Sequence, residues 1–210
     1  MLRAMAFHPM LSALMLLTLP LDQDTDELAQ VREADAIACR LDVPAYQRFA
    51  MALEGEEQRA ARRGWRKVSP EDAALLEYTL PAPITVAGSY RTRRIAFTGS
   101  GILAILDLPD PGVIAAGEQI ANQMDVEPLI AEIVASGKAT RAEAEQLIKF
   151  RKFLGERVIK DVTEPAAEGE SFGSRTTVVR SISNSPAYPG KTLYGCAYRM
   201  EILDKDGTPL

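Results

Sequence analysis

The sequence predicts an α+β fold, a single compact domain with a largely antiparallel β-sheet and packed helices, preceded by an N-terminal signal segment. Apolar residues recur at helical spacing near the start of the chain and again after residue 110, and short β-branched and aromatic runs lie between them. A composition of 47% hydrophobic and 25% charged residues is typical of a globular protein. The 210 residues leave room for one domain of ordinary size, residues 25–210, after a segment at 1–24.

Residues 1–24 have the pattern of a secretory signal. Arg3 is followed by an apolar run at residues 10–21, and the sequence then turns acidic. Such a run is too short for a bilayer, which needs roughly 20 residues, but it fits the apolar region of a signal peptide. No small-x-small cleavage pattern follows Leu21. An amphipathic first helix or a misassigned start codon are the alternatives to export, and we expect a periplasmic or secreted protein with no transmembrane span.

Two helices are expected after this segment. Residues 25–38 carry apolar residues at helical spacing with acids in the first turn, which suits the helix dipole, and this helix should end near Cys39. Asp42 is then the predicted N-cap of a second helix, whose apolar stripe is Tyr46, Phe49, Ala50 and Leu53.

An antiparallel meander is expected next. Five short runs, residues 65–69, 75–81, 84–90, 92–98 and 102–108, are separated by proline- and glycine-containing stretches. Gly99-Ser100-Gly101 predicts a hairpin turn, and the run at 102–108 is apolar on both faces, as in a central strand.

The second half should return to helices and end in a hairpin. Residues 112–124 and 126–136 have helical spacing, and Thr140 with Glu143 predicts a capping box that opens the longest helix, which should run until Pro165 ends it. Its expected buried stripe is Leu147, Phe150, Leu154 and Val158, with Ile148 and Ile159 offset by one. Residues 164–174 read as a polar loop, and residues 175–183 and 192–203 as two strands of a long hairpin.

Cys39 and Cys196 are the only cysteines. Alternation along the last strand turns Cys196 toward the core. In an oxidising compartment the two residues predict one disulfide, closing a loop worth on the order of 5 kcal/mol by chain entropy. A cytosolic chain would instead hold two buried thiols.

Histidine chemistry is not expected in the mature protein. The only histidine, His8, lies in the predicted signal, so no base is left for a serine or cysteine nucleophile and no histidine metal site remains. Carboxylates can still work in pairs. The acids at residues 54, 56 and 57 and at 143 and 145 fall on expected exposed helix faces. We therefore predict no catalytic, cofactor-binding or metal-binding residues and no cofactor.

A net charge of −5 and a pI near 5.1 argue against nucleic acid as a partner. The expected function is an exported, non-catalytic protein that binds a protein partner, an envelope component or a small apolar ligand. The alternative is an envelope hydrolase that uses carboxylates without histidine. A pocket where two acids converge with raised pKa values would favour the enzyme, and an apolar cleft without acids would favour binding.

Loops on a rigid scaffold commonly carry partner contacts. The two loops at residues 164–174 and 183–191 are the expected contact regions, with Phe172, Pro186 and Tyr188 as the candidate residues. The identity of the partner and the oligomeric state stay open at this stage.

Overall fold

A computed structural model describes residues 30–55, 58–69, 71–148 and 150–210. The predicted signal segment at residues 1–24 lies outside the described residues, as do the first residues of the helix expected at 25–38. The part of the chain from Val31 to Leu210 is one compact unit.

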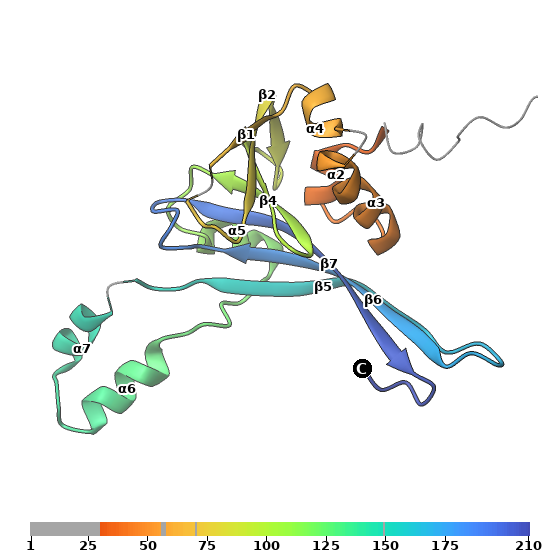
Figure 1. The fold of residues 1–210 in the computed structure, drawn as a ribbon. Coiled ribbons are helices and arrows are strands. Elements are labelled where there is room, and N and C mark those ends of the chain that lie inside the picture. Colours follow the sequence, from red (N-terminus) through yellow and green to blue (C-terminus); the bar gives the residue numbers. More distant parts are fainter. Residues whose placement is uncertain (1–29, 56–57, 70, 149) are drawn as a thin grey trace, which may run out of the picture. The chain divides into compact units, whose positions relative to one another are not determined.

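The predicted α+β fold is confirmed. Seven strands of the described chain form a single antiparallel sheet in the order β1-β2-β3-β4-β7-β6-β5 (Figure 1). The strands are β1 Arg66–Val68, β2 Leu76–Val86, β3 Tyr90–Phe97, β4 Gly101–Leu106, β5 Leu154–Glu164, β6 Phe172–Ser183 and β7 Thr192–Asp204. The helices are α2 Glu33–Ile37, α3 Val43–Glu54, α4 Arg59–Arg62, α5 Gly112–Glu118, α6 Glu127–Ala135 and α7 Arg141–Leu147.

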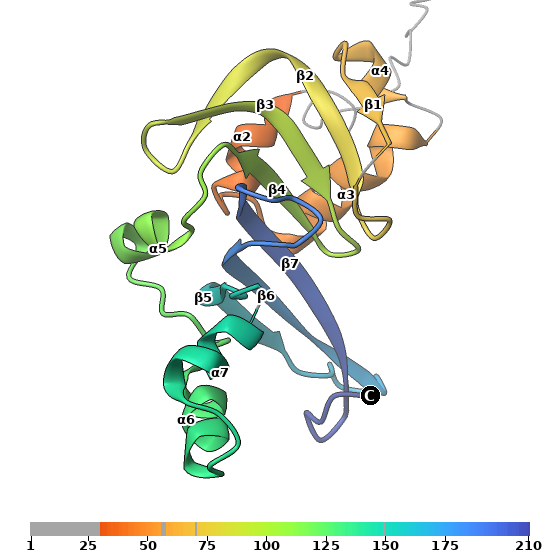
Figure 2. The ribbon, with the colours of Figure 1, turned by 90° about the vertical axis from the view of Figure 1, so that its left-hand side faces the viewer.

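Two groups of strands meet at β7. Figure 2 shows β2, β3 and β4 in the upper part of the sheet and β5, β6 and β7 below them. β4 is the middle strand, as its two-sided apolar pattern predicted, and it pairs with β7 from Gly101↔Ala197 to Leu106↔Thr192. The hairpin turn predicted at residues 99–101 joins β3 to β4, and the Thr98 amide donates to the Gly101 carbonyl at 2.8 Å.

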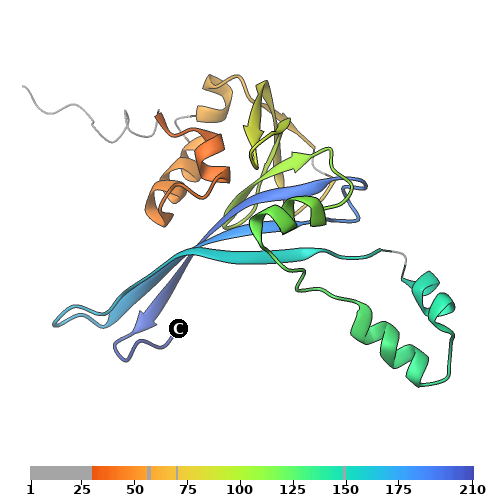
Figure 3. The ribbon, with the colours of Figure 1, turned by 180° about the vertical axis from the view of Figure 1, so that it is seen from behind.

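Both faces of the sheet are covered near β4. On one face, α2 and α3 pack over a core that includes Ile95 and Cys196. The side chains of Ile95 and Cys196 point to the same side of the sheet as those of Tyr194 and Tyr198. On the other face, the loop between β6 and β7 packs Tyr188 against Ala96, Ile105 and Leu193. Seen from behind in Figure 3, α5 lies beside the strands β6 and β7, and its last residue bonds to Tyr194 of β7.

The predicted second helix and its cap are confirmed. Asp42 accepts a hydrogen bond from the Ala45 amide at 2.8 Å, and α3 buries Tyr46, Phe49 and Leu53. The first helix ends at Ile37, close to the expected position.

Two runs that the sequence predicts as separate strands lie mainly in a single strand, β2. Residues 75–81 and 84–90 were expected as separate runs divided by Pro81 and Pro83, yet both prolines lie inside β2. The register with β3 shifts between Thr79 and Ile84, so residues 80–83 stand outside the regular ladder. Proline lacks an N–H donor and is tolerated where no ladder bond is needed.

The long helix predicted from Thr140 to Pro165 is wrong in its second half. The capping box between Thr140 and Glu143 is present, but α7 ends at Leu147 and residues 154–164 form β5. β-Branched residues crowd this stretch, and β5 pairs with β6 along its whole length. The spacing of four between Leu154 and Val158 fits one face of a strand as well as one face of a helix, so it could not distinguish the two. Val158 is exposed.

The disulfide between Cys39 and Cys196 is present. It joins the turn after α2 to the central part of β7, and both cysteines are buried. β6 and β7 form the predicted final hairpin, although β6 begins at Phe172, inside the expected polar loop.

Candidate ligand-binding groove

A groove of about 930 Å³ opens where α3 passes over the end of the sheet. It is lined by one side of α3, the segment 73–76 before and into β2, the end of β3 with its turn at residues 97–100, and residues 198–200 of β7. Its volume is within the range of about 300–1,000 Å³ that is usual for small-molecule sites.

The lining combines apolar side chains with the polar Gln47, Thr98 and Ser100, and it holds no carboxylate or imidazole. None of the residues that line the groove is Asp, Glu, His or Cys. Its one charged residue, Arg199, forms an ion pair with Glu156 of β5 at 2.6 Å. Tyr198 and Met200 alternate with Arg199 along β7, so they point to the opposite face of the strand. The groove can therefore hold apolar groups and offers no carboxylate to move a proton.

The floor of the groove is a pair of stacked tyrosines. The rings of Tyr46 and Tyr198 lie 4.1 Å apart between centroids with their planes 10° apart. The Tyr198 hydroxyl donates to the Ala36 carbonyl at 2.6 Å. Burial raises the pKa of both hydroxyl groups well above the usual value. Both phenols are therefore neutral at physiological pH.

A cluster of aromatic rings fixes α3 on the sheet behind this floor. Phe49 of α3 contacts Trp65 and Phe97, and Tyr78 of β2 closes the cluster from the far side. The Tyr78 hydroxyl donates to Glu54 at 2.9 Å, which ties the end of α3 to β2. The groove wall is thus part of the core and is held in place before any ligand arrives.

A second, smaller hollow of about 470 Å³ continues the apolar surface along β7. Phe172, Ile202, Pro209 and Leu210 line it, and Met200 lines both hollows. Met200 is 43% exposed, Phe172 56% and Ile202 47%. The alternation of side chains along β7 predicts that Met200 and Ile202 share the face of Cys196. The core ends at Tyr198, however, so the side chains of Met200 and Ile202 on that face are exposed.

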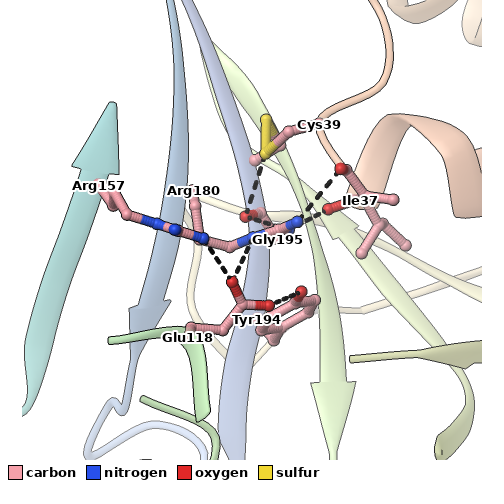
Figure 4. Close-up of polar contacts among 9 residues, drawn as sticks. Ile37, Cys39, Glu118, Arg157, Arg180, Tyr194 and Gly195 are labelled. Carbon is pink, nitrogen blue, oxygen red and sulfur yellow. Dashed lines mark hydrogen bonds and ion pairs between the residues drawn. A yellow bond between two sulfur atoms is a disulfide. The ribbon is translucent and has the colours of Figure 1, made fainter. Parts of the chain in front are cut away.

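A separate polar cluster lies beneath β7 and is built around a buried arginine (Figure 4). Arg180 donates to the carbonyl oxygens of Ile37, Ala38 and Gly195 at 2.6, 3.1 and 3.2 Å. Its guanidinium stacks over the ring of Tyr194 at 4.5 Å. The cluster joins the end of α2 to β6 and β7 beside the disulfide, since Arg180 pairs with Cys196 in the sheet.

Glu118 at the end of α5 completes this cluster. Its carboxylate accepts from Tyr194 and Arg157 at 2.8 Å each, and the Arg180 Nε lies 3.9 Å away. Tyr194 and Arg157 donate to this carboxylate, whereas the buried Arg180 Nε makes no hydrogen bond within the described residues. The arrangement suits a structural link better than a site of proton transfer.

The acid pairs considered from the sequence are occupied elsewhere. Glu54 is bound by Lys67, which lowers the pKa of its carboxyl, and the capping box of Thr140 lowers the pKa of Glu143. Glu145 pairs with Arg141, and residues 56 and 57 lie outside the described residues. Asp35 and Asp161 also have lowered pKa values because arginines donate to them. A carboxyl with a lowered pKa is ionised near neutral pH and cannot act there as a general acid.

The three predicted contact residues are not together. Phe172 is exposed in the second hollow and Pro186 is exposed on the loop between β6 and β7. Tyr188 is only 1% exposed, and its hydroxyl donates to buried Glu77 at 3.1 Å. Its ring belongs to the core, so a partner on this loop would meet Pro186 and not Tyr188.

Sequence reasoning missed the residues that line the groove. Met51 lies off the apolar stripe of α3, and a methionine outside that stripe is a signal that could have been read from the sequence. In the structure its side chain is 79% exposed. Phe97 and Tyr198 gave no such signal, because their place beside α3 depends on the pairing of distant strands.

No group of three or more metal-ligating side chains occurs among the residues that the structure describes. Within the same residues, no helix is long and apolar enough to cross a membrane. No family model, no curated protein and no solved structure matches the chain.

Proposed function

We propose that the protein is exported to an oxidising compartment, the periplasm or the cell exterior, and acts there as a non-catalytic binding protein. The groove between α3 and the end of the sheet holds the ligand. The single observation that carries the proposal is the lining of this groove, which is more apolar than polar and contains no carboxylate, histidine or cysteine.

The disulfide supports export. Disulfides persist in oxidising compartments and are rare in cytosolic proteins. The pattern of residues 1–24 points the same way. Cleavage of that segment would leave the domain from about residue 25 onward.

Binding is favoured over the alternative, a hydrolase that uses carboxylates. Such an enzyme needs two acids beside the bound substrate, one of them with a raised pKa. The groove provides none, and each described carboxyl with a displaced pKa is displaced downward.

Titration with the fluorescent apolar probe N-phenyl-1-naphthylamine tests the groove. We expect saturable binding that Met51→Asp weakens by roughly a few fold, since the change replaces an apolar side chain at the exposed rim of the groove by a charged one. Arg48→Asp is the control, because Arg48 is exposed on the same helix and does not line the groove. Equal probe binding by both variants would place the probe elsewhere and contradict the proposal.

Intact mass tests export. The full-length chain is expressed in a two-membrane bacterium and alkylated after denaturation, before and after reduction. Loss of about two dozen N-terminal residues, with alkylation only after reduction, is the expected result. An uncut chain with two free thiols would refute export.

A further inference from the structure

We infer that Met51 and Met200 are modification sites that control the groove: their oxidation to methionine sulfoxide by a peroxide lowers the affinity of the groove for apolar ligands. The inference rests on the proposed binding function and adds a form of regulation to it. It is carried by the placement of the two methionines, which line the same groove from α3 and from β7.

The seven methionines of the chain fall into two sets. Four of them, at positions 1, 5, 10 and 15, belong to the predicted signal segment, and its cleavage would remove them. The other three are Met51, Met124 and Met200. Met51 and Met200 line the groove, and Met124 does not. Two of the three methionines of the processed domain are therefore at its proposed binding site.

A dissolved oxidant can reach all three of these side chains. Met51 is 79% exposed, Met124 48% and Met200 43%. Methionine tolerates burial well and commonly fills gaps in a core, so its exposure on the wall of a groove is informative. Met124, just before α6, is exposed about as much as Met200 and serves as an internal control for oxidation outside the groove.

The cysteines do not compete for the oxidant. The chain has two, Cys39 and Cys196, which are joined to each other and buried. Their sulfur atoms are already oxidised to the disulfide. The thioethers of the methionines are therefore the reduced sulfur atoms that a mild oxidant meets first in the domain.

The reaction needs no catalytic group from the protein. The thioether sulfur attacks one oxygen of hydrogen peroxide, and the S–O bond forms as the O–O bond breaks. The second oxygen takes the proton of the first and leaves as water. Sulfur loses the two electrons that the peroxide gains, and the methionine gains one oxygen atom. Methionine sulfoxide reductases reverse this change.

The product is poorly suited to an apolar ligand. A thioether is flexible and polarisable and adapts to an apolar surface, whereas a sulfoxide is polar and its oxygen accepts hydrogen bonds. A bound apolar ligand would displace water from that oxygen and offers no donor in exchange, which is unfavourable. The groove itself has few side-chain donors that could replace the water, namely those of Gln47, Thr98 and Ser100.

Titration with N-phenyl-1-naphthylamine before and after oxidation tests the inference. The processed, disulfide-bonded protein is treated with hydrogen peroxide, and peptide mass mapping counts the oxygen gained at each methionine. We expect the affinity of the wild-type protein for the probe to fall by about fivefold once both groove methionines are sulfoxides.

Two variants locate the effect. Met51→Leu combined with Met200→Leu keeps apolar side chains of similar volume but removes both thioethers of the groove. We expect this double variant to keep its affinity after peroxide treatment, although Met124 is still oxidised. Met124→Leu is the matched control and should lose affinity as the wild-type protein does.

Ligand protection provides a second measurement on the wild-type protein. A saturating concentration of N-phenyl-1-naphthylamine should slow the oxidation of Met51 and Met200, because the probe covers them in the groove. The rate at Met124 should stay the same, which also shows that the probe does not consume the peroxide.

Each contrary result is distinct. Unchanged affinity of the wild-type protein with both sulfoxides in place, or an equal loss in the double variant, overturns the inference and leaves the proposed function standing. Equal protection of all three methionines, or of none, also overturns it. Absence of probe binding before oxidation would remove the proposed function and the inference with it. Protection is measured on the wild-type protein, so the test stays decisive even if the double variant fails to fold.

Discussion

Tyr46 of α3 and Tyr198 of β7 stack face to face, with ring centroids 4.1 Å apart. The contact joins the helix that forms the groove wall to the strand that forms its floor, two residues from Cys196 of the disulfide. The position of α3, and hence the width of the groove, depends on this pair.

Tyr198→Phe tests the hydroxyl of this pair. The change keeps the ring but removes the 2.6 Å donor of the buried Ala36 carbonyl, which still accepts from the Cys39 amide at 3.1 Å, so we expect a loss of about 1 kcal/mol in the free energy of unfolding. Urea denaturation measures it. Tyr90→Phe, at the half-buried start of β3, is the control and should change stability by less than about 0.5 kcal/mol. A silent Tyr198→Phe would contradict the role given to this bond.

Alkaline pH should unfold the protein cooperatively. Burial raises the pKa of Tyr46, Tyr194 and Tyr198 above the ordinary value of 10.0. The unfolded chain loses these protons first, so the stability they confer is complete below about pH 10 and falls as pH rises beyond it. Absorbance at 295 nm should show these phenolates only together with loss of the far-ultraviolet circular dichroism. Ionisation of all six tyrosines in a folded chain would disprove the prediction.

Gly195→Ala should destabilise the protein strongly. A Cβ atom at Gly195 would lie 2.0 Å from the Ile102 carbonyl oxygen and 2.8 Å from the Leu103 Cα atom, so it would overlap the backbone of β4. We expect a loss of about 3 kcal/mol or more, at the upper end of overpacking effects. The control is Gly117→Ala in α5, where no atom lies within 4 Å of the added Cβ, and where alanine should stabilise the helix by about 0.5–1 kcal/mol. Thermal unfolding of the two variants should shift in opposite directions.

Arg180→Met should cost about 3 kcal/mol or more, because three carbonyl oxygens lose their donor and Glu118 loses a neighbouring cation. Arg175→Met is the comparison, since Arg175 forms an exposed pair with Asp161 and should cost less than about 1 kcal/mol. Similar values for both would mean that the buried arginine is not the link between α2 and β7 that its contacts indicate.

Local signals in the sequence were sufficient for much of this fold. Asp42 and Thr140 are read correctly as caps because capping depends on residues three positions apart. The disulfide could be predicted because the chain has two cysteines and its N-terminal pattern indicates an oxidising compartment. The helix predicted across residues 154–164 failed because its apolar spacing suits either structure, and only pairing with β6 selects the strand.

The groove could not be predicted for a related reason. Its walls come from α3, from the turn after β3 and from β7, and the pairing of β4 with β7, in which Gly101 lies opposite Ala197, brings the turn and β7 together. Tyr188 shows the same limit: a tyrosine in a loop with Pro186 looked accessible, yet Glu77, 111 residues away, holds it in the core.

The strand order also constrains how the protein is made. β7 is the last strand in the sequence and lies between β4 and β6, so β1–β4 and β5–β6 are synthesised as two separate pieces, each with an open edge. Neither Cys39 nor the two edges can find their final partners until β7 has left the ribosome or the translocation channel. During that interval the nascent chain carries an unpaired thiol and two exposed sheet edges, and unpaired edges are prone to aggregation. The bridge between Cys39 and Cys196 can therefore form only after β7 has been synthesised, and it then ties the turn after α2 to the strand that joins the two halves of the sheet.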